Sequence, residues 1–282
     1  MFFQCISVTI FNQYPKLTTT LYIREKIITM LTTLERFFRE NPSVALGFSG
    51  GTDSSYLLYA GGRYGAKVKA YYVKTAFQPA FELADARKIA EQVGAALTVI
   101  ELDILKYPRV TDNPPDRCYY CKSLIFNAIR ERAASDGFAI LIDGNNASDD
   151  ASDRAGMRAV GELGVRSPLR ECGITKAEVR RLSKEAGLFT WDKPAYACLA
   201  TRIQNGQVIT GDLLARVEKA EDALFDMGFS DFRVRVRGND AVLQFISSQI
   251  DKAWHVREDI KLAIKPYFNN ASLDMSARAD SA

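Results

Sequence analysis

The sequence predicts an α/β fold: a first domain built on a parallel sheet, followed by a small C-terminal α+β domain. Three observations lead to this prediction. Short apolar runs alternate with amphipathic helical segments between residues 30 and 204. A glycine- and serine-rich loop directly follows the first apolar run. After about residue 205 the order changes to helix, two strands and helix, in a chain whose 282 residues suit one medium and one small domain.

In the first domain, four strands are predicted at residues 44–48, 67–74, 96–102 and 138–143. The helical pattern between them covers residues 54–64, 79–93 and 122–134. Strands separated by helices of this length form βαβ units and hence a parallel sheet. A further helix, 176–186, begins at a capping box made by Thr175 and Glu178. Because ligands on such sheets bind beyond the carboxyl ends of the strands, we expect the loops after the strands to form the site.

In the second domain, helices are predicted at 211–227 and 250–264 around strands at 232–237 and 241–246, with a hairpin turn at Gly238. The polar tail is expected to fray. The N-terminal residues lack the basic start of a signal peptide, and we interpret them as a poorly ordered extension. The expected organisation is an extension (1–29), a ligand-binding domain (30–204), a small domain for substrate binding or oligomerisation (205–268) and a tail (269–282).

Composition excludes several classes of protein. No apolar run approaches the ~20 residues of a membrane-spanning helix. A net charge of +3 gives no indication of a nucleic-acid partner. Five cysteines, an odd number in a chain of this length, predict a reducing, cytoplasmic compartment and thiols with chemical or metal-binding roles. The single histidine, His255, excludes a histidine-rich zinc site.

The most specific motif is GFSGGTDSS at residues 47–55, directly after the first strand and at the start of a helix. Glycines let the backbone turn tightly, and the exposed N–H groups with the helix N-terminus form an anion site. The motif lacks the Gly-Lys-[Ser/Thr] ending of a Walker A loop. It resembles the loop of the PP-loop ATP pyrophosphatases, which have a Rossmann-like parallel sheet and cleave ATP between the α and β phosphates. The expected ATP contacts are Ser49, Gly50, Gly51, Thr52, Asp53 and Ser54, with Asp53 also holding Mg²⁺.

Cysteines of interest occur at three places. Cys118 and Cys121 form a CxxC pair just before a predicted helix, a spacing that suits zinc, iron, a redox disulfide or two buried thiols. Cys198 lies between Lys193 and Arg202, whose charges would lower its pKa and make it a better nucleophile if they lie close. On its own, a cysteine between alanines is more often a packing residue. Cys172 precedes the capping-box helix, and we interpret it as a packing residue that could alternatively be a fourth metal ligand.

Arginines alternate with valines along the first strand of the second domain. Arg233, Arg235 and Arg237 therefore share one face of that strand. Guanidinium groups suit bidentate phosphate binding, but a solvated edge face would have the same pattern. The strand alone does not distinguish these two interpretations.

Four segments together resemble the LarE family of ATP-dependent sulfurtransferases. They are GFSGGTDSS (47–55), GNNASDDASDRAGMRA (144–159), VRSPLRECGITKAEVRRLSKEAGL (165–188) and WDKPAYACLATR (191–202). The first segment is shared by many PP-loop enzymes, and the combination with the other three indicates LarE. The similarity extends from about residue 30 to residue 268.

This resemblance implies adenylation of a carboxylate of pyridinium-3,5-biscarboxylic acid mononucleotide and its conversion to a thiocarboxylate, for the nickel-pincer nucleotide cofactor of lactate racemase. It implies a catalytic role for Asp53 and Cys198, with sulfur donated by Cys198 itself or by a [4Fe-4S] cluster on Cys118, Cys121 and Cys198. The resemblance favours the cluster type because all three cysteines are present. It also implies that Arg202, Arg233 and Arg235 bind the substrate phosphate, and that the enzyme is a homo-oligomer.

Two other classes of function remain open at this point. One is a PP-loop enzyme that thiolates tRNA or forms an amide. A net charge of +3 does not indicate the broad basic surface that a tRNA enzyme usually needs, and an amide-forming synthetase has no need of three cysteines. The other is a nucleotide-binding iron–sulfur or zinc protein without catalysis, which would bind ATP and release no AMP.

Overall fold

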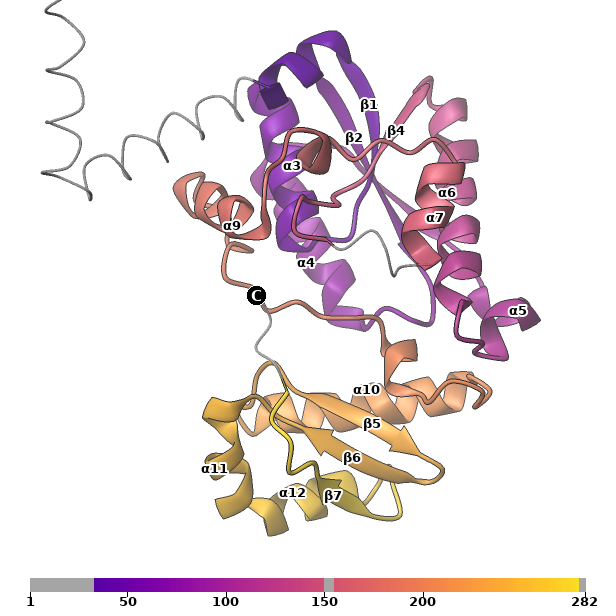
Figure 1. Cartoon of the computed structure of the whole chain (residues 1–282), viewed down its shortest axis with the longest axis vertical. Coiled ribbons are helices and arrows are strands. Elements are labelled where there is room, and N and C mark those ends of the chain that lie inside the picture. The colour runs from indigo at the N-terminus through magenta and orange to yellow at the C-terminus, as the bar shows by residue number, and fades with distance from the viewer. Residues whose placement is uncertain (1–32, 150–154, 279–282) are drawn as a thin grey trace, which may run out of the picture.

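The computed structural model describes residues 33–149 and 155–278 (Figure 1). The predicted extension at 1–29 lies outside these residues, as does part of the segment 144–159. Residues 33–40 are helical and lead into the first strand.

Within the described residues, four parallel strands form one sheet in the order β3-β2-β1-β4. They are β1 (Ser43–Gly47), β2 (Lys67–Lys74), β3 (Leu97–Glu101) and β4 (Ile140–Ile142). The prediction of a parallel α/β sheet is confirmed. The central strand β1 is an apolar run because it pairs on both sides, with β2 and with β4, and its residues Val44, Ala45 and Leu46 are fully buried.

Helices cover both faces of this sheet. On one face, α3 (Thr52–Arg63), α4 (Ala80–Gln92) and α9 (Lys176–Glu185) pack in one apolar cluster. On the other face, α6 (Arg117–Ser135) and α7 (Ala155–Glu162) pack in a second cluster. Figure 1 shows α3 and α4 on one side of the strands and α6 and α7 on the other. The predicted capping box is present: the Thr175 side chain accepts from the backbone N–H of Glu178, whose carboxylate accepts from the backbone of Thr175.

Several short elements escaped the sequence analysis. These are η1 (Ile104–Lys106), α5 (Pro108–Thr111), α8 (Pro168–Glu171) and η2 (Leu199–Arg202). The helix predicted at 122–134 begins earlier, at Arg117, so the CxxC pair lies inside α6 and not before it. At most four residues long, the short elements do not span enough turns to produce a recognisable apolar period.

Within residues 205–278, the C-terminal unit is a mixed sheet in the order β5-β6-β7 with three helices. Its elements are α10 (Gly211–Asp226), β5 (Arg233–Arg237), β6 (Asp240–Gln244), α11 (Ser247–His255), α12 (Arg257–Ile264) and β7 (Ala271–Leu273). The helix predicted at 250–264 is thus two helices. The tail departs from the prediction of fraying, because β7 pairs with β6 in parallel and Arg278 forms a bridge with Ile246.

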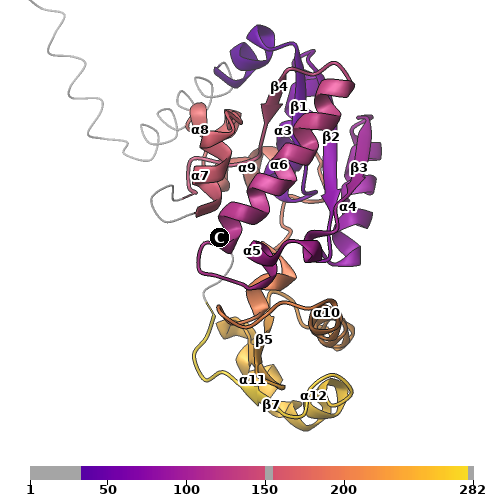
Figure 2. The same cartoon turned by 90° about the vertical axis from the view of Figure 1, so that its right-hand side faces the viewer.

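The C-terminal unit lies beyond the carboxyl ends of the parallel strands, and β2 runs toward that unit (Figure 2). The segment 191–202 crosses between the two units and ends in η2. Leu199 and Ala200 of η2 are buried in an apolar cluster that is formed mostly by the C-terminal unit and also includes Phe77, Ile104 and Val110. None of the described helices is long and apolar enough to cross a membrane.

Candidate functional site

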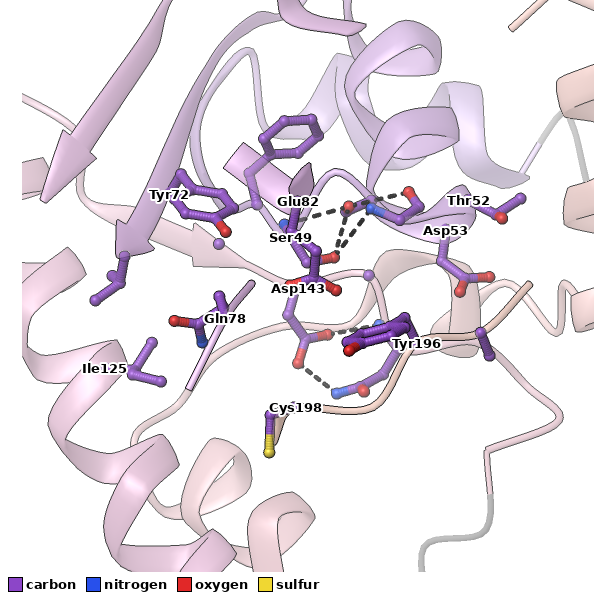
Figure 3. Close-up of a pocket in the computed structure, with 18 of the residues that line it drawn as sticks. Ser49, Thr52, Asp53, Tyr72, Gln78, Glu82, Ile125, Asp143, Tyr196 and Cys198 are labelled. Carbon is purple, nitrogen blue, oxygen red and sulfur yellow. Dashed lines mark hydrogen bonds between the residues drawn. The ribbon is translucent and has the colours of Figure 1, made fainter. Parts of the chain in front are cut away.

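A cavity of about 430 Å³ opens at the carboxyl ends of the parallel strands. Its floor is the loop after β1, and its walls come from β2, α4, α6 and the loop after β4. Residues 193–198 of the connecting segment form its remaining wall, which we call the roof. In Figure 3, Tyr72, Gln78 and Ile125 lie at one end of this cavity, Thr52 and Asp53 at the other, and Cys198 at its edge.

The loop after β1 has the geometry expected of an anion site. Gly50 has φ +72°, and a Cβ there would lie 3.0 Å from the backbone of Ala86, so only glycine fits without strain. The hydroxyls of Ser49 and Ser54 lie 3.2 Å apart, and the backbone N–H of Gly51 donates to Ser49 Oγ. All predicted ATP contacts except Gly50 line the cavity.

Thr52 and Asp53 form contacts that the sequence did not predict. The Thr52 hydroxyl is buried and donates to the carbonyl of Thr190 at 2.8 Å, which anchors the start of the connecting segment. The carboxylate of Asp53 accepts from Lys176 Nζ at 2.5 Å and from Asn146 Nδ2 at 3.2 Å. Lys176 is the first residue of α9, so the capping box places a cation beside the loop from Ser49 to Ser54, which we call the phosphate loop.

Asp143 is a site residue that the sequence analysis did not single out. It follows β4 and lines the cavity, where it accepts from Ser167 Oγ at 2.7 Å and from the backbone N–H of Asn145 at 3.1 Å. Burial raises the pKa of its carboxyl. Its place at the end of a predicted strand was the signal that could have identified it.

Glu82, in the first turn of α4, was also missed. Its carboxylate lines the cavity and makes neither a hydrogen bond nor an ion pair with any residue that the structure describes. Burial raises the pKa of Glu82 to about 7, and Asp85 acts in the same direction. Three cations oppose the shift: Lys193 and Arg202 of the connecting segment and Lys74 of β2. Lys193 is itself paired with Asp85 at 2.6 Å.

The three cysteines of interest lie near one another at one edge of the site. Cys118 is exposed and Cys121 is half-buried, one turn apart on α6, and Cys198 is the N-cap of η2. Burial raises the pKa of Cys121 to about 12, and the neighbouring Cys198 and Cys118 contribute to the shift. Among residues 33–149 and 155–278, no group of three or more Cys, His, Asp or Glu side chains is arranged to hold a metal ion.

The expectation of a lowered pKa for Cys198 is wrong. Burial raises the pKa of its thiol, and the opposing charges of Arg117 and Arg202 do not overcome this effect. Lys193 lies in the same cavity wall but is paired with Asp85. Cys172 packs against the core of the α/β unit, away from the other cysteines, which agrees with its interpretation as a packing residue.

The predicted phosphate-binding arginines are largely engaged within the protein. Arg202 is fully buried and forms an ion pair with Glu221 at 2.8 Å. Arg233 is also buried and donates to the carbonyl of Ala195 in the roof at 2.6 Å. Arg235 is half-buried; it donates to Gln244 Oε1 at 2.9 Å and to the carbonyl of Thr201. At Arg233 and Arg235 the arginine face of β5 therefore meets the connecting segment and is not a solvated edge, whereas Arg237 is exposed.

Comparison with known proteins gives the family. No family model matches the chain. A pyridinium-3,5-bisthiocarboxylic acid mononucleotide synthase of Lactiplantibacillus plantarum is 32% identical over 228 residues, 79% of this chain and 82% of that protein. An uncharacterised protein of Synechocystis is 37% identical over 79% of this chain and 83% of its own length. One of Methanocaldococcus jannaschii is 27% identical over 86% of this chain and 92% of its own length. On this similarity, and with a phosphate loop and a cysteine in one cavity, the chain belongs to the pyridinium-3,5-bisthiocarboxylic acid mononucleotide synthase (LarE) family.

Proposed function

We propose that this protein uses ATP to convert a carboxylate of pyridinium-3,5-biscarboxylic acid mononucleotide into a thiocarboxylate, for maturation of the nickel-pincer nucleotide. The observation that carries the proposal is the shared cavity: the phosphate loop and Cys198 line the same space. An adenylating site and a sulfur donor must both reach one carboxyl carbon, and a shared cavity allows this.

In the first step, the triphosphate of ATP binds the loop from Ser49 to Ser54. Asp53 is the proposed Mg²⁺ ligand. Its carboxylate pairs with Lys176 in the structure, and binding of Mg²⁺ to that carboxylate would release Lys176 to contact phosphate. A substrate carboxylate oxygen then attacks the α-phosphorus, forms an acyl adenylate and releases pyrophosphate. The protein contributes positioning and charge neutralisation to this step.

In the second step, a sulfur nucleophile attacks the carboxyl carbon of the acyl adenylate and displaces AMP. If the nucleophile is the Cys198 thiolate, the resulting thioester releases the thiocarboxylate by β-elimination, which breaks the Cβ–Sγ bond of Cys198 and leaves dehydroalanine; if it is a sulfide, the displacement gives the thiocarboxylate directly. Cys198 is the proposed catalytic cysteine, because it is the cysteine that lines the cavity beside the phosphate loop. Cys118, Cys121 and Cys198 are the residues that would hold a [4Fe-4S] cluster, whose open iron could carry an extra sulfide. Among the described residues, no group of three such side chains is arranged to hold a metal ion, so no step is assigned to the cluster.

Arg233 and Arg235 are the proposed ligands of the substrate phosphate. Both project from β5 toward the connecting segment, and Arg235 is the more exposed of the two. Arg202 is better explained as a structural residue, since its guanidinium is fully buried against Glu221.

The test is a product assay by mass spectrometry. Anaerobically purified protein is incubated with Mg-ATP and pyridinium-3,5-biscarboxylic acid mononucleotide, and we expect AMP and thiocarboxylate in equal amounts. Cys198→Ala should abolish thiocarboxylate, whereas Cys172→Ala, a matched removal of a half-buried thiol, should leave it unchanged. Absence of AMP with the wild-type protein would refute the proposed function.

A further inference from the structure

Two polar side chains on neighbouring elements line the cavity without a protein partner. The hydroxyl of Tyr72 on β2 is buried and has no hydrogen-bond partner among the described residues. The carboxylate of Glu82 on α4 likewise forms no hydrogen bond or ion pair there. Glu82 is the charged group that, after burial itself, raises the pKa of the Tyr72 hydroxyl, so the two groups lie within electrostatic range. Leaving buried polar groups unpaired costs free energy, which a ligand can recover.

The position of Glu82 indicates which part of a ligand it meets. Apolar side chains of Val73, Ile125 and Phe126 line one part of the cavity, and the phosphate loop lines another. In Figure 3, Glu82 lies between the end marked by Tyr72 and Ile125 and the end marked by Asp53. A nucleotide bound with its triphosphate on the loop and its base on the apolar side chains has its ribose between the two.

The chemistry agrees with this position. A carboxylate is only an acceptor, and the two ribose hydroxyls are donors that one carboxylate can accept together. Acidic side chains bind ribose hydroxyls in the same way in dinucleotide-binding folds. A tyrosine hydroxyl both donates and accepts, so Tyr72 can complete the hydrogen bonds of one ribose hydroxyl.

We propose that Glu82 and Tyr72 form the ribose site of this protein and select ribonucleotides with free 2′ and 3′ hydroxyls. The proposal rests on the proposed use of ATP but on no particular sulfur donor. The groups that face Glu82 are Lys193 and Arg202 from the connecting segment, Lys74 from β2 and Asp85 from its own helix.

The experiment measures the affinity of the protein for ATP and for 2′,3′-dideoxy-ATP by calorimetry with Mg²⁺. For the wild type we expect ATP to bind at least about tenfold more tightly than dideoxy-ATP. Dideoxy-ATP lacks the hydroxyls that would donate one or two hydrogen bonds to the charged acceptor. Glu82→Gln should bring this ratio to within about threefold, because its amide replaces a charge-assisted acceptor by a neutral one.

Tyr72→Phe gives an independent arm. It should weaken ATP binding by about threefold to tenfold. It should not lower the stability of the unliganded protein, because it removes a hydroxyl that has no partner. Tyr71→Phe is the matched control on the same strand. Tyr71 also lines the cavity, but its hydroxyl already donates to Asp136 at 2.9 Å, so this variant should lose stability and keep its ATP affinity.

Each outcome decides. An unchanged ratio in Glu82→Gln, or an unchanged ATP affinity in Tyr72→Phe, overturns the ribose site while the adenylation assay still stands. If Glu82→Gln changed the preference for ATP over inosine triphosphate but left the ratio of ATP to dideoxy-ATP affinity unchanged, Glu82 would contact the base. That result would also overturn the ribose site. A wild-type protein that binds no ATP would refute the ribose site and the proposed function together.

Discussion

The buried ion pair between Arg202 and Glu221 provides a quantitative test of how the connecting segment is held on the C-terminal unit. Glu221 Oε1 accepts from Arg202 Nε at 2.8 Å and from the backbone N–H of Val234 at 3.0 Å, and Glu221 Oε2 accepts from Arg202 Nη2 at 3.1 Å. The hydroxyl of Tyr196 also donates to Glu221. Burial alone would lower the pKa of Arg202, but the Glu221 carboxylate overcomes this effect and raises it. The guanidinium is therefore charged and depends on one counter-ion.

Glu221→Gln keeps the size of the side chain and its acceptor for Val234 but removes that counter-ion. Because Arg202 is 0% exposed and Glu221 1% exposed, solvent cannot replace the lost charge, and we expect a loss of about 3–5 kcal/mol in the free energy of unfolding. That is a large part of the ~5–15 kcal/mol total of an ordinary domain. Adding Arg202→Met to the first substitution removes the stranded charge, so the double variant should recover at least about 2 kcal/mol.

The assay is urea unfolding followed by tryptophan fluorescence, with the denaturant slope compared between variants. Glu185→Gln is the control, since it breaks a surface pair with Arg181 at a carboxylate that is 58% exposed and should cost about 0–1 kcal/mol. A loss below about 1 kcal/mol for Glu221→Gln, or no recovery in the double variant, would show that the pair does not stabilise the packing of the connecting segment on the C-terminal unit.

Three further predictions concern the cavity. Gly50→Ala should weaken ATP binding at least about tenfold, because its φ of +72° and a Cβ 3.0 Å from the backbone of Ala86 force the phosphate loop to move; calorimetry checks this, and unaltered affinity would contradict it. Lys176→Met should weaken ATP binding and leave that of adenosine unchanged, because the lysine is proposed to contact phosphate; equal losses for both ligands would argue against that role. The preference for ATP over dideoxy-ATP should rise as the pH increases through about 7, where the Glu82 carboxyl loses its proton and becomes a pure acceptor. Titration of the triphosphate cancels in this ratio, and a flat profile from pH 6 to 8 for the wild type would exclude the Glu82 carboxylate as the cause.

Local sequence determined the parts of this protein whose interactions span only a few residues. The apolar run of β1, the glycine loop after it and the capping box of α9 were all predicted correctly. Their conformations depend on backbone sterics, on N–H groups at a helix start and on side chains three residues apart. The parallel fold class followed because alternating strands and helices have few ways to pack.

Tertiary structure decided what each polar side chain contacts. Lys176 contacts Asp53, which is 123 residues away in the sequence, and a local sequence pattern cannot predict such a contact. The alternation along β5 placed Arg233 and Arg235 on one face, but only the packing of the connecting segment buries that face. The pKa of Cys198 depends on burial more than on the cations near it in sequence. Charge and hydrogen bonding in a cavity depend on which elements enclose it, because removing water changes the energy of every polar group inside.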